Sequence, residues 1–229
     1  MNAKEYLGKL LVLFDQHADE GNAVPMKKYM REQFDYYGVK APLRKSLVKE
    51  FVKKHGRLAG DELKMFSRLA FRENHREIQY ALGDLIIPIA KKLDPSFLPL
   101  FKELIQTKSW WDTVDFIAPH FVGKILLNYP DLIANYPEKW IESDNIWLQR
   151  SAILYQLHYK EKIDAERLFR YILRRADSKE FFVQKAAGWT LRQYSKFNAK
   201  EVIHFINSHD LASLTKKEGL KWLERRNKK

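Results

Sequence analysis

The sequence predicts an all-α fold, an α-solenoid of repeated helix pairs with a concave basic groove. Two observations lead to this prediction. Apolar residues recur at three- and four-residue spacing along the chain, which is the period of one face of a helix. Residues that favour the start of a helix recur about every 35 residues, which leaves room for two helices in each repeat. Such units cannot bury their apolar faces alone and must stack on one another.

Composition excludes several classes of protein. Lysine and arginine number 41 against 29 acidic residues, and the formal net charge of +12 favours a polyanionic partner. Apolar residues make up 45% of the chain, so it is not a disordered basic tail. Cysteine is absent, which excludes disulfides and thiol nucleophiles. The longest apolar stretches are far below the ~18 residues of a membrane span, so we expect a cytoplasmic protein that does not enter the membrane.

The helices are expected in a regular order. Near the N-terminus, the apolar pattern predicts helices close to 4–16, 25–37 and 42–55. The first helices of the later repeats are expected at favoured N-cap or first-turn residues, separated by 34 or 35 positions. These residues are Asp61, Pro95, Pro130, Asp164 and Asn198.

The second helices of the repeats form a parallel series. Their expected starts are Asn74, Ser109, Asp144 and, after a slip of about one residue, Asp177 or Ser178. Three of these starts are followed by an acidic residue three positions later, which is the spacing of a reciprocal capping box. The pairs are Asn74 with Glu77, Ser109 with Asp112, and Asp177 with Glu180.

The repeats are expected to form one domain. The period lies between tetratricopeptide and HEAT lengths, and the tetratricopeptide signature residues are absent. No low-complexity linker divides the chain, so residues 1–229 are predicted to be a single domain of HEAT-like repeats. Its last part is basic, which most often marks a solvated helix face. The basic residues there are Lys216, Lys217, Lys221, Arg225, Arg226, Lys228 and Lys229.

One repeated position combines unusual residues. The sixth residue after each second-helix start is Tyr80, Asp115, Arg150 or Lys185, at intervals of 35. Equivalent positions in stacked repeats lie along one face, so we expect the last three to be neighbours. Aromatic and apolar residues flank them, which favours a desolvated cleft. A purely structural interpretation, in which Asp115 and Arg150 form an ion pair between repeats, is equally open.

Pro119 follows Asp115 by four residues in the same predicted helix. A proline has no N–H to donate to the carbonyl four residues earlier, which here belongs to Asp115. We therefore expect a local irregularity in the helix beside this carboxylate.

Four runs of sequence carry a specific resemblance. They are PMKKYM (25–30), TKSWWDTVD (107–115), SDNIWLQRSAIL (143–154) and SKEFFVQKAAGW (178–189). Together they closely resemble, in family order, the AlkD-type DNA alkylation-repair glycosylases. The resemblance implies an all-helical array of HEAT-like repeats. It also implies excision of cationic alkylated purines, notably 7-methylguanine and 3-methyladenine, from duplex DNA without extrusion of the base.

The resemblance also assigns roles to residues of this sequence. It places the family's catalytic aspartate on Asp115 and its two sugar-facing tryptophans on Trp111 and Trp189. The active-site arginine falls on Arg150, which we expect to hold a phosphate near the lesion. Tyr29 takes the place of a tyrosine that borders the lesion.

These residue types suit the implied reaction. Alkylation at N7 or N3 makes the purine cationic, so it leaves as a neutral base and needs no general acid. Positive charge builds on the sugar as the bond stretches, and a fixed carboxylate such as Asp115 stabilises that charge in the transition state. The indole faces of Trp111 and Trp189 would attract the same charge. Lys185 could act as a lyase nucleophile, but we expect it to contact phosphate or water and the glycosylase to be monofunctional.

No metal or other cofactor is expected. The seven histidines lack zinc-site spacing, and the H-x-D run at residues 17–19 is interpreted as chance. The expected partner is double-stranded DNA containing alkylated bases, bound by a monomer. Two alternatives stay open: a non-catalytic HEAT-like repeat protein that binds damaged or branched DNA, and a scaffold for an acidic protein.

Overall fold

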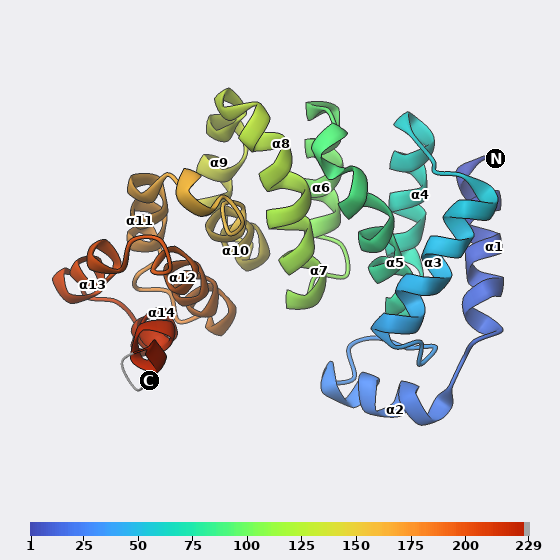
Figure 1. Cartoon of the computed structure of the whole chain (residues 1–229), viewed down its shortest axis with the longest axis horizontal. Helices are drawn as coiled ribbons and strands as arrows, with labels where there is room; N and C mark the ends of the chain where they lie inside the picture. The colour runs from blue at the N-terminus through green and yellow to red at the C-terminus, as the bar shows by residue number, and fades with distance from the viewer. Residues whose placement is uncertain (227–229) are drawn as a thin grey trace. The chain divides into compact units, whose positions relative to one another are not determined.

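The computed structural model describes residues 1–226, and its regular structure is helical (Figure 1). Among these residues, the one β-type pairing is an isolated bridge between Asp35 and His75. The predicted all-α solenoid of helical repeats is confirmed. Two compact units divide the chain, the first being Met1–Lys108 and the second beginning at Ser109. Lys228 and Lys229, part of the basic segment noted in the sequence, lie outside the described residues.

The first unit is built from six α-helices and two short 3₁₀ segments, at 87–92 and 95–97. Helix α1 packs on α4, and α5 packs on both α3 and α4 (Figure 1). The α-helices are α1 (Ala3–Asp15), α2 (Glu20–Tyr29), α3 (Ala41–His55), α4 (Gly60–Arg72), α5 (Arg76–Ile86) and α6 (Leu98–Ile105).

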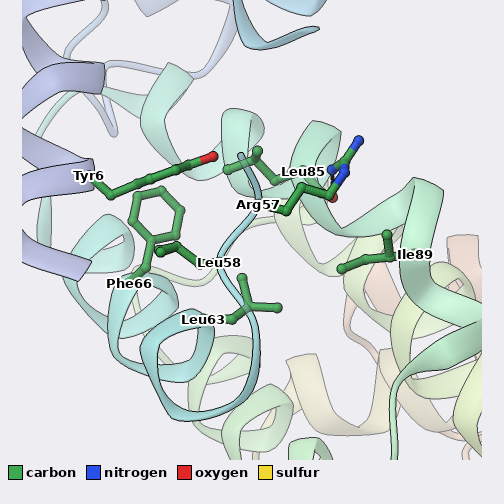
Figure 2. Close-up of a pocket in the computed structure, with 7 residues that line it drawn as sticks. All are labelled: Tyr6, Arg57, Leu58, Leu63, Phe66, Leu85 and Ile89. Carbon is green, nitrogen blue, oxygen red and sulfur yellow. Dashed lines mark hydrogen bonds between the residues drawn. The ribbon is translucent and has the colours of Figure 1, made fainter. Parts of the chain in front are cut away.

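A small pocket in this unit is lined mainly by apolar and aromatic side chains (Figure 2). The ring of Tyr6 meets those of Phe51 and Phe66 edge-on, with centroid distances of 4.8 and 5.2 Å. The guanidinium of Arg57 donates to the carbonyl of Leu85 at 2.7 Å. The two polar side chains that line the pocket, Tyr6 and Arg57, both donate to backbone carbonyls, which favours a structural role for it.

The second unit contains the remaining α-helices, a π-helix at 117–122 and 3₁₀ segments at 130–135 and 160–162. Helix α10 packs on α7, α9 and α12, and α12 packs along α14. The α-helices are α7 (Trp111–Phe116), α8 (Gly123–Asn128), α9 (Pro137–Ile141), α10 (Ile146–Leu154), α11 (Ala165–Arg174), α12 (Phe181–Tyr194), α13 (Ala199–Ser208) and α14 (Ser213–Arg226).

The 35-residue period is stricter in the structure than in the predicted caps. The second helices α5, α7, α10 and α12 begin at Arg76, Trp111, Ile146 and Phe181, at intervals of 35 throughout. Their N-cap positions lie one residue later than predicted for the first three and two to three later for α12, so the expected slip is wrong. Predicted caps of first helices at Asp164 and Asn198 are confirmed, since both side chains accept a backbone N–H.

A glutamine stands at the same position in three of these four second helices. Gln79, Gln149 and Gln184, each the fourth residue of its helix, donate from the side-chain amide to the carbonyl six residues earlier. The N···O distances are 3.1, 2.6 and 2.8 Å. Each amide thereby satisfies a loop carbonyl just before the helix and fixes the turn inside the repeat.

The capping box expected at Asn74 and Glu77 is wrong. Glu77 is fully buried, and its carboxylate accepts backbone N–H groups of Tyr37, Gly38 and Val39 at 3.2, 2.9 and 3.1 Å. Burial raises the pKa of Glu77, against the lowering effect of these donors. A distant loop therefore takes the acceptor that the local spacing assigned to the helix start.

The helix expected near 25–37 is also wrong in its bounds. Asp19 caps α2, which begins at Glu20, runs through Pro25 and ends at Tyr29. Arg31 and Glu32 then take positive φ values of 56° and 59°, which a helix does not allow. The segment that follows is the loop held by Glu77.

No helix of residues 1–226 combines the length and the apolar character that a membrane crossing requires.

Candidate functional site

Asp115 lies where a regular helix gives way to an irregular one. It is the penultimate residue of α7, and the chain continues as a π-helix from Ile117 to Val122. Pro119 lies inside that segment and cannot donate to the carbonyl of Asp115. The predicted irregularity beside the carboxylate is therefore confirmed, and its cause is the missing N–H. Such π segments are frequent at functional sites.

Arg150 grips the Asp115 carboxylate with two hydrogen bonds. Its Nε donates to Oδ1 at 2.8 Å and its Nη2 donates to Oδ2 at 2.9 Å. Nη1 donates to the backbone carbonyl of Phe182 at the start of α12. Arg150 is 4% exposed, whereas the Asp115 side chain is 18% exposed. The ion pair that the purely structural interpretation expected is therefore present, and the carboxylate also keeps a solvent-facing edge.

Two opposing effects set the charge of this carboxylate. Burial raises the pKa of Asp115 to about 6, while the neighbouring Arg150 guanidinium lowers it and Asp112 raises it slightly. The two hydrogen bonds from Arg150 favour the ionised form of the carboxylate. Because the carboxylate is mostly buried, water screens it poorly, and it interacts strongly with any positive charge placed beside it.

Three successive second helices supply the predicted site residues of this unit. Trp111 is the first residue of α7, one helical turn before Asp115, and Trp189 lies in α12. Both indoles are half-buried. Because α10 packs against α7 and α12, the Arg150 helix lies between the helices that carry the two tryptophans.

An aromatic cluster that the sequence interpretation missed supports Arg150. The ring of Trp110 lies 5.8 Å from that of Trp147 and 5.2 Å from that of Phe182, and the last two rings are 5.0 Å apart. The three rings pack the beginnings of α7, α10 and α12 together. The Phe182 carbonyl at the start of α12 is thereby held where Arg150 can donate to it. Trp147 and Phe182 occupy equivalent positions 35 residues apart, a signal the sequence did contain.

Lys185, whose repeat position predicted that it would neighbour Asp115 and Arg150, forms its ion pair elsewhere. Its ammonium lies 2.9 Å from Glu218 of α14. Tyr80, the equivalent residue of the first unit, shares a hydrogen bond with the Tyr36 hydroxyl at 3.1 Å. The repeat position therefore correctly paired Asp115 with Arg150, but a helix outside the series captures Lys185.

Tyr29 belongs to the first unit. It is the last residue of α2, and 72% of its surface is exposed. Lys27, two residues earlier, forms an ion pair with Asp35 at 2.8 Å and ties α2 to the loop that follows it.

Comparisons with known proteins show which family this chain resembles. The profile of a family described as "DNA alkylation repair enzyme" matches residues 11–223. A solved structure described as a predicted DNA alkylation repair enzyme from Enterococcus faecalis is 30% identical, with a TM-score of 0.83 over 90% of this chain and 96% of that one. The smu.31 protein of Streptococcus mutans UA159 shares the fold at 15% identity, with a TM-score of 0.58 over 91% and 98% of the two chains. No curated protein matches the sequence.

Removal of Arg150 is expected to destabilise the protein strongly. Arg150→Met leaves the buried Asp115 carboxylate without its cation, which costs about 3–5 kcal/mol in free energy of unfolding. Adding Asp115→Asn removes the stranded charge and should recover part of that loss. Chemical denaturation at pH 7.5 measures both. Arg68→Met is the matched control, because its ion pair with Glu103 is exposed and is worth about 1 kcal/mol or less. Equal losses in the two single variants would contradict a tightly coupled buried pair.

Proposed function

The chain belongs to the family of DNA alkylation repair enzymes, and we propose that its activity is that of a monofunctional DNA glycosylase. It hydrolyses the N-glycosidic bond of cationic alkylated purines, such as 7-methylguanine and 3-methyladenine, in double-stranded DNA. The observation that carries the proposal is the rigidly held, partly exposed carboxylate of Asp115. The protein acts as a monomer in the cytoplasm.

The carboxylate acts on the sugar. As the bond to the cationic base stretches, positive charge moves onto C1′ and the ring oxygen of deoxyribose. Asp115 then gains attraction that it lacks in the ground state, which lowers the barrier. Its two bonds to Arg150 fix its orientation in advance, so little reorganisation is needed during the reaction. Each oxygen retains a lone pair, which can orient the attacking water.

Arg150 orients the Asp115 carboxylate, but it also weakens the attraction between that carboxylate and the sugar cation. A guanidinium bonded to both oxygens offsets part of the carboxylate's charge, but burial raises the free energy of the ionised acid. A developing sugar cation relieves that cost. Arg150 also donates to the Phe182 carbonyl, and since only 4% of its surface is exposed, contact with a DNA phosphate is confined to the small part of the side chain that solvent reaches.

The two tryptophans complete the sugar site. An indole face attracts a cation by about 1–2 kcal/mol where water is excluded. Trp111 and Trp189 are half-buried, so their rings are fixed by packing and still reachable. They hold the nucleotide by its sugar while its base stays stacked. Tyr29 keeps the role that the resemblance implies, which is to border the lesion.

Lys185 supports hydrolysis over a lyase reaction. A Schiff base requires a free amine, whereas the Lys185 ammonium is held at 2.9 Å from a buried carboxylate. Sodium borohydride should therefore trap no protein on lesion-containing DNA.

One observation favours a second candidate, a non-catalytic protein that binds damaged or branched DNA. A carboxylate bonded twice to a buried arginine is also what a purely structural ion pair would look like. Release of free base separates the two candidates, because only the glycosylase breaks the bond.

Purified protein is expected to release 7-methylguanine from methylated duplex DNA without added metal. Hypoxanthine in an otherwise identical duplex should be released at least ~100-fold more slowly, because a neutral base is a poor leaving group without a general acid. Chromatography of the freed bases measures both rates. Comparable release of the two bases would contradict the charge argument, and release of neither would favour the non-catalytic candidate.

Asp115→Asn is expected to lower the rate of 7-methylguanine release by at least ~100-fold. Affinity for DNA should stay the same or rise slightly, because the substitution removes a negative charge near the phosphates. Asp112→Asn, one turn away on the same helix, is the matched control and should change release only a few-fold. Thermal melts establish that both variants fold. A full rate in Asp115→Asn would remove this carboxylate from the mechanism.

Base release is expected to depend on pH through Asp115. Protonation removes the anion, so the single-turnover rate should be nearly flat from pH 7 to 8 and fall about tenfold per unit well below the pKa of about 6. Rates from pH 5 to 8, after subtraction of spontaneous base loss, test this. A profile without a step near pH 6 would contradict either the raised pKa of Asp115 or the need for its ionised form, and the rate of Asp115→Asn at pH 7.5 separates these two outcomes.

A further inference from the structure

Three cations converge on one buried carboxylate in the second unit. Glu218 of α14 has a side chain that is 9% exposed. Its Oε1 lies 2.9 Å from the Lys185 ammonium and 3.6 Å from that of Lys221, and its Oε2 accepts from Arg192 Nη1 at 2.8 Å. Burial opposes ionisation of Glu218, but the three cations outweigh it and hold the pKa of this carboxyl below its usual range. We call these four residues the Glu218 cluster.

The packing of α14 on α12 fixes the position of Glu218. Gly188 of α12 leaves no room for a side chain, since a Cβ there would lie 2.5 Å from the Cβ of Glu218 and 2.8 Å from the carbonyl oxygen of Thr215. The Thr215 hydroxyl donates to the carbonyl of Gln184 at 3.2 Å. The two helices therefore meet at backbone distance, and the carboxylate is held rigidly beside the α12 cations.

The cluster carries more positive charge than its carboxylate neutralises. Three cations against one anion leave a surplus of +2, and the exposed fractions of Lys185, Arg192 and Lys221 are 35%, 26% and 42%. Like charges held this close repel one another, so the arrangement favours an additional anion.

A second carboxylate cluster in the same unit gives the contrast. There, four arginines are balanced by three acidic side chains, which leaves a surplus of only +1. Its members are Arg167, Arg170, Arg174 and Arg175 with Glu138, Glu142 and Asp164. The Glu218 cluster thus carries the larger surplus, and it does so with a single carboxylate.

The cluster shares a helix face with a predicted site residue. Lys185, Trp189 and Arg192 stand at positions i, i+4 and i+7 of α12, which place them along one side. Phe181, one turn before Lys185, is 53% exposed, and the Lys185 ammonium lies 6.0 Å from its ring centroid. Cations and aromatic rings alternating along one face are suited to a nucleic-acid strand, whose phosphates and sugars alternate.

We propose that Lys185, Arg192 and Lys221 bind a backbone phosphate of DNA and that Glu218 is the residue that positions these cations. The ligand class rests on the proposed function. Lysine offers three N–H donors and arginine five, so donors remain for phosphate oxygens after Glu218 is satisfied. Glu218 lowers the local charge, yet it orders long side chains before the DNA arrives and so reduces the entropic cost of binding.

The direction in which Glu218→Gln changes the affinity for DNA tests the proposal. Glu218→Gln raises the net charge by one, which by itself would tighten DNA binding. The glutamine NH₂, however, would face cation donors and release at least one of them, so affinity for an unmodified duplex should fall about 3- to 10-fold. Glu224→Gln, an exposed site on the same helix, is the matched control with the same change in charge, and it should leave binding unchanged or slightly tighter.

Salt dependence tests the three cations directly. For Lys185→Ala, Arg192→Ala and Lys221→Ala, the slope of log K against log salt concentration should become less steep by up to about 0.9 for each phosphate that the variant no longer neutralises. Arg174→Ala, from the second carboxylate cluster, is the matched control and should keep the full slope. Fluorescence anisotropy with an unmodified duplex measures both affinity and slope, and circular dichroism shows that each variant is folded.

Several results would overturn the phosphate site. Tighter binding by Glu218→Gln would deny the positioning role, and unchanged slopes in the three alanine variants would deny that these cations bind phosphate. An equal change of slope in Arg174→Ala would reduce the effect to general charge. If Glu218→Gln fails to fold, the alanine slopes decide. The test is separate from catalysis, because full binding without base release would refute the glycosylase proposal and leave the phosphate site standing.

Discussion

The ion pair between Asp115 and Arg150 is the interaction on which the candidate site depends. One guanidinium binds both oxygens of a carboxylate on α7 and also a carbonyl at the start of α12, so it links three successive second helices. A buried ion pair is a weak source of stability, because well-packed apolar residues in its place are often as good or better. Its physical effect is to fix where the negative charge lies and which edge of it faces solvent.

Two further features keep that charge in place. The Trp110, Trp147 and Phe182 rings pack the helix beginnings together around the arginine. On the other side, Pro119 removes a donor that would otherwise bond the Asp115 carbonyl, and the helix continues with a π segment. The orientation of the carboxylate thus comes from its two bonds to Arg150, and the backbone that follows it is irregular because of Pro119.

Asp115 and Glu218, two of the carboxylates of the second unit that bind cations, differ in charge balance. Asp115 meets one arginine, whereas Glu218 meets three cations and leaves a surplus. The Asp115 carboxylate, with one arginine, is suited to stabilising a positive charge that forms only during a reaction. The cations around Glu218, with their surplus charge, are suited to binding an anion. Trp189 and Lys185, one helical turn apart on α12, bring the two kinds of chemistry onto the same helix. On the proposed function, this face meets a sugar at Trp189 and a phosphate at Lys185 and Arg192, which lie on either side of Trp189 along the helix.

Features that depend on short-range periodicity and on covalent structure could be predicted from the sequence. The apolar spacing predicted an all-α chain, the recurring starts predicted a repeat of about 35 residues, and that register brought Asp115 to Arg150. Pro119 predicted the irregular helix because a missing N–H is a property of the residue itself.

Which distant partner each polar side chain binds could not be read from the sequence, because it depends on how the helices pack. Glu77 matched a local capping box, yet it binds the loop at 37–39, where three backbone N–H groups need acceptors. Lys185 shares the register of Arg150, yet Glu218 takes it, because Gly188 allows α14 to approach α12 closely. Spacing along a helix limits which groups can meet, but burial and the competition for hydrogen-bond partners decide which of them do.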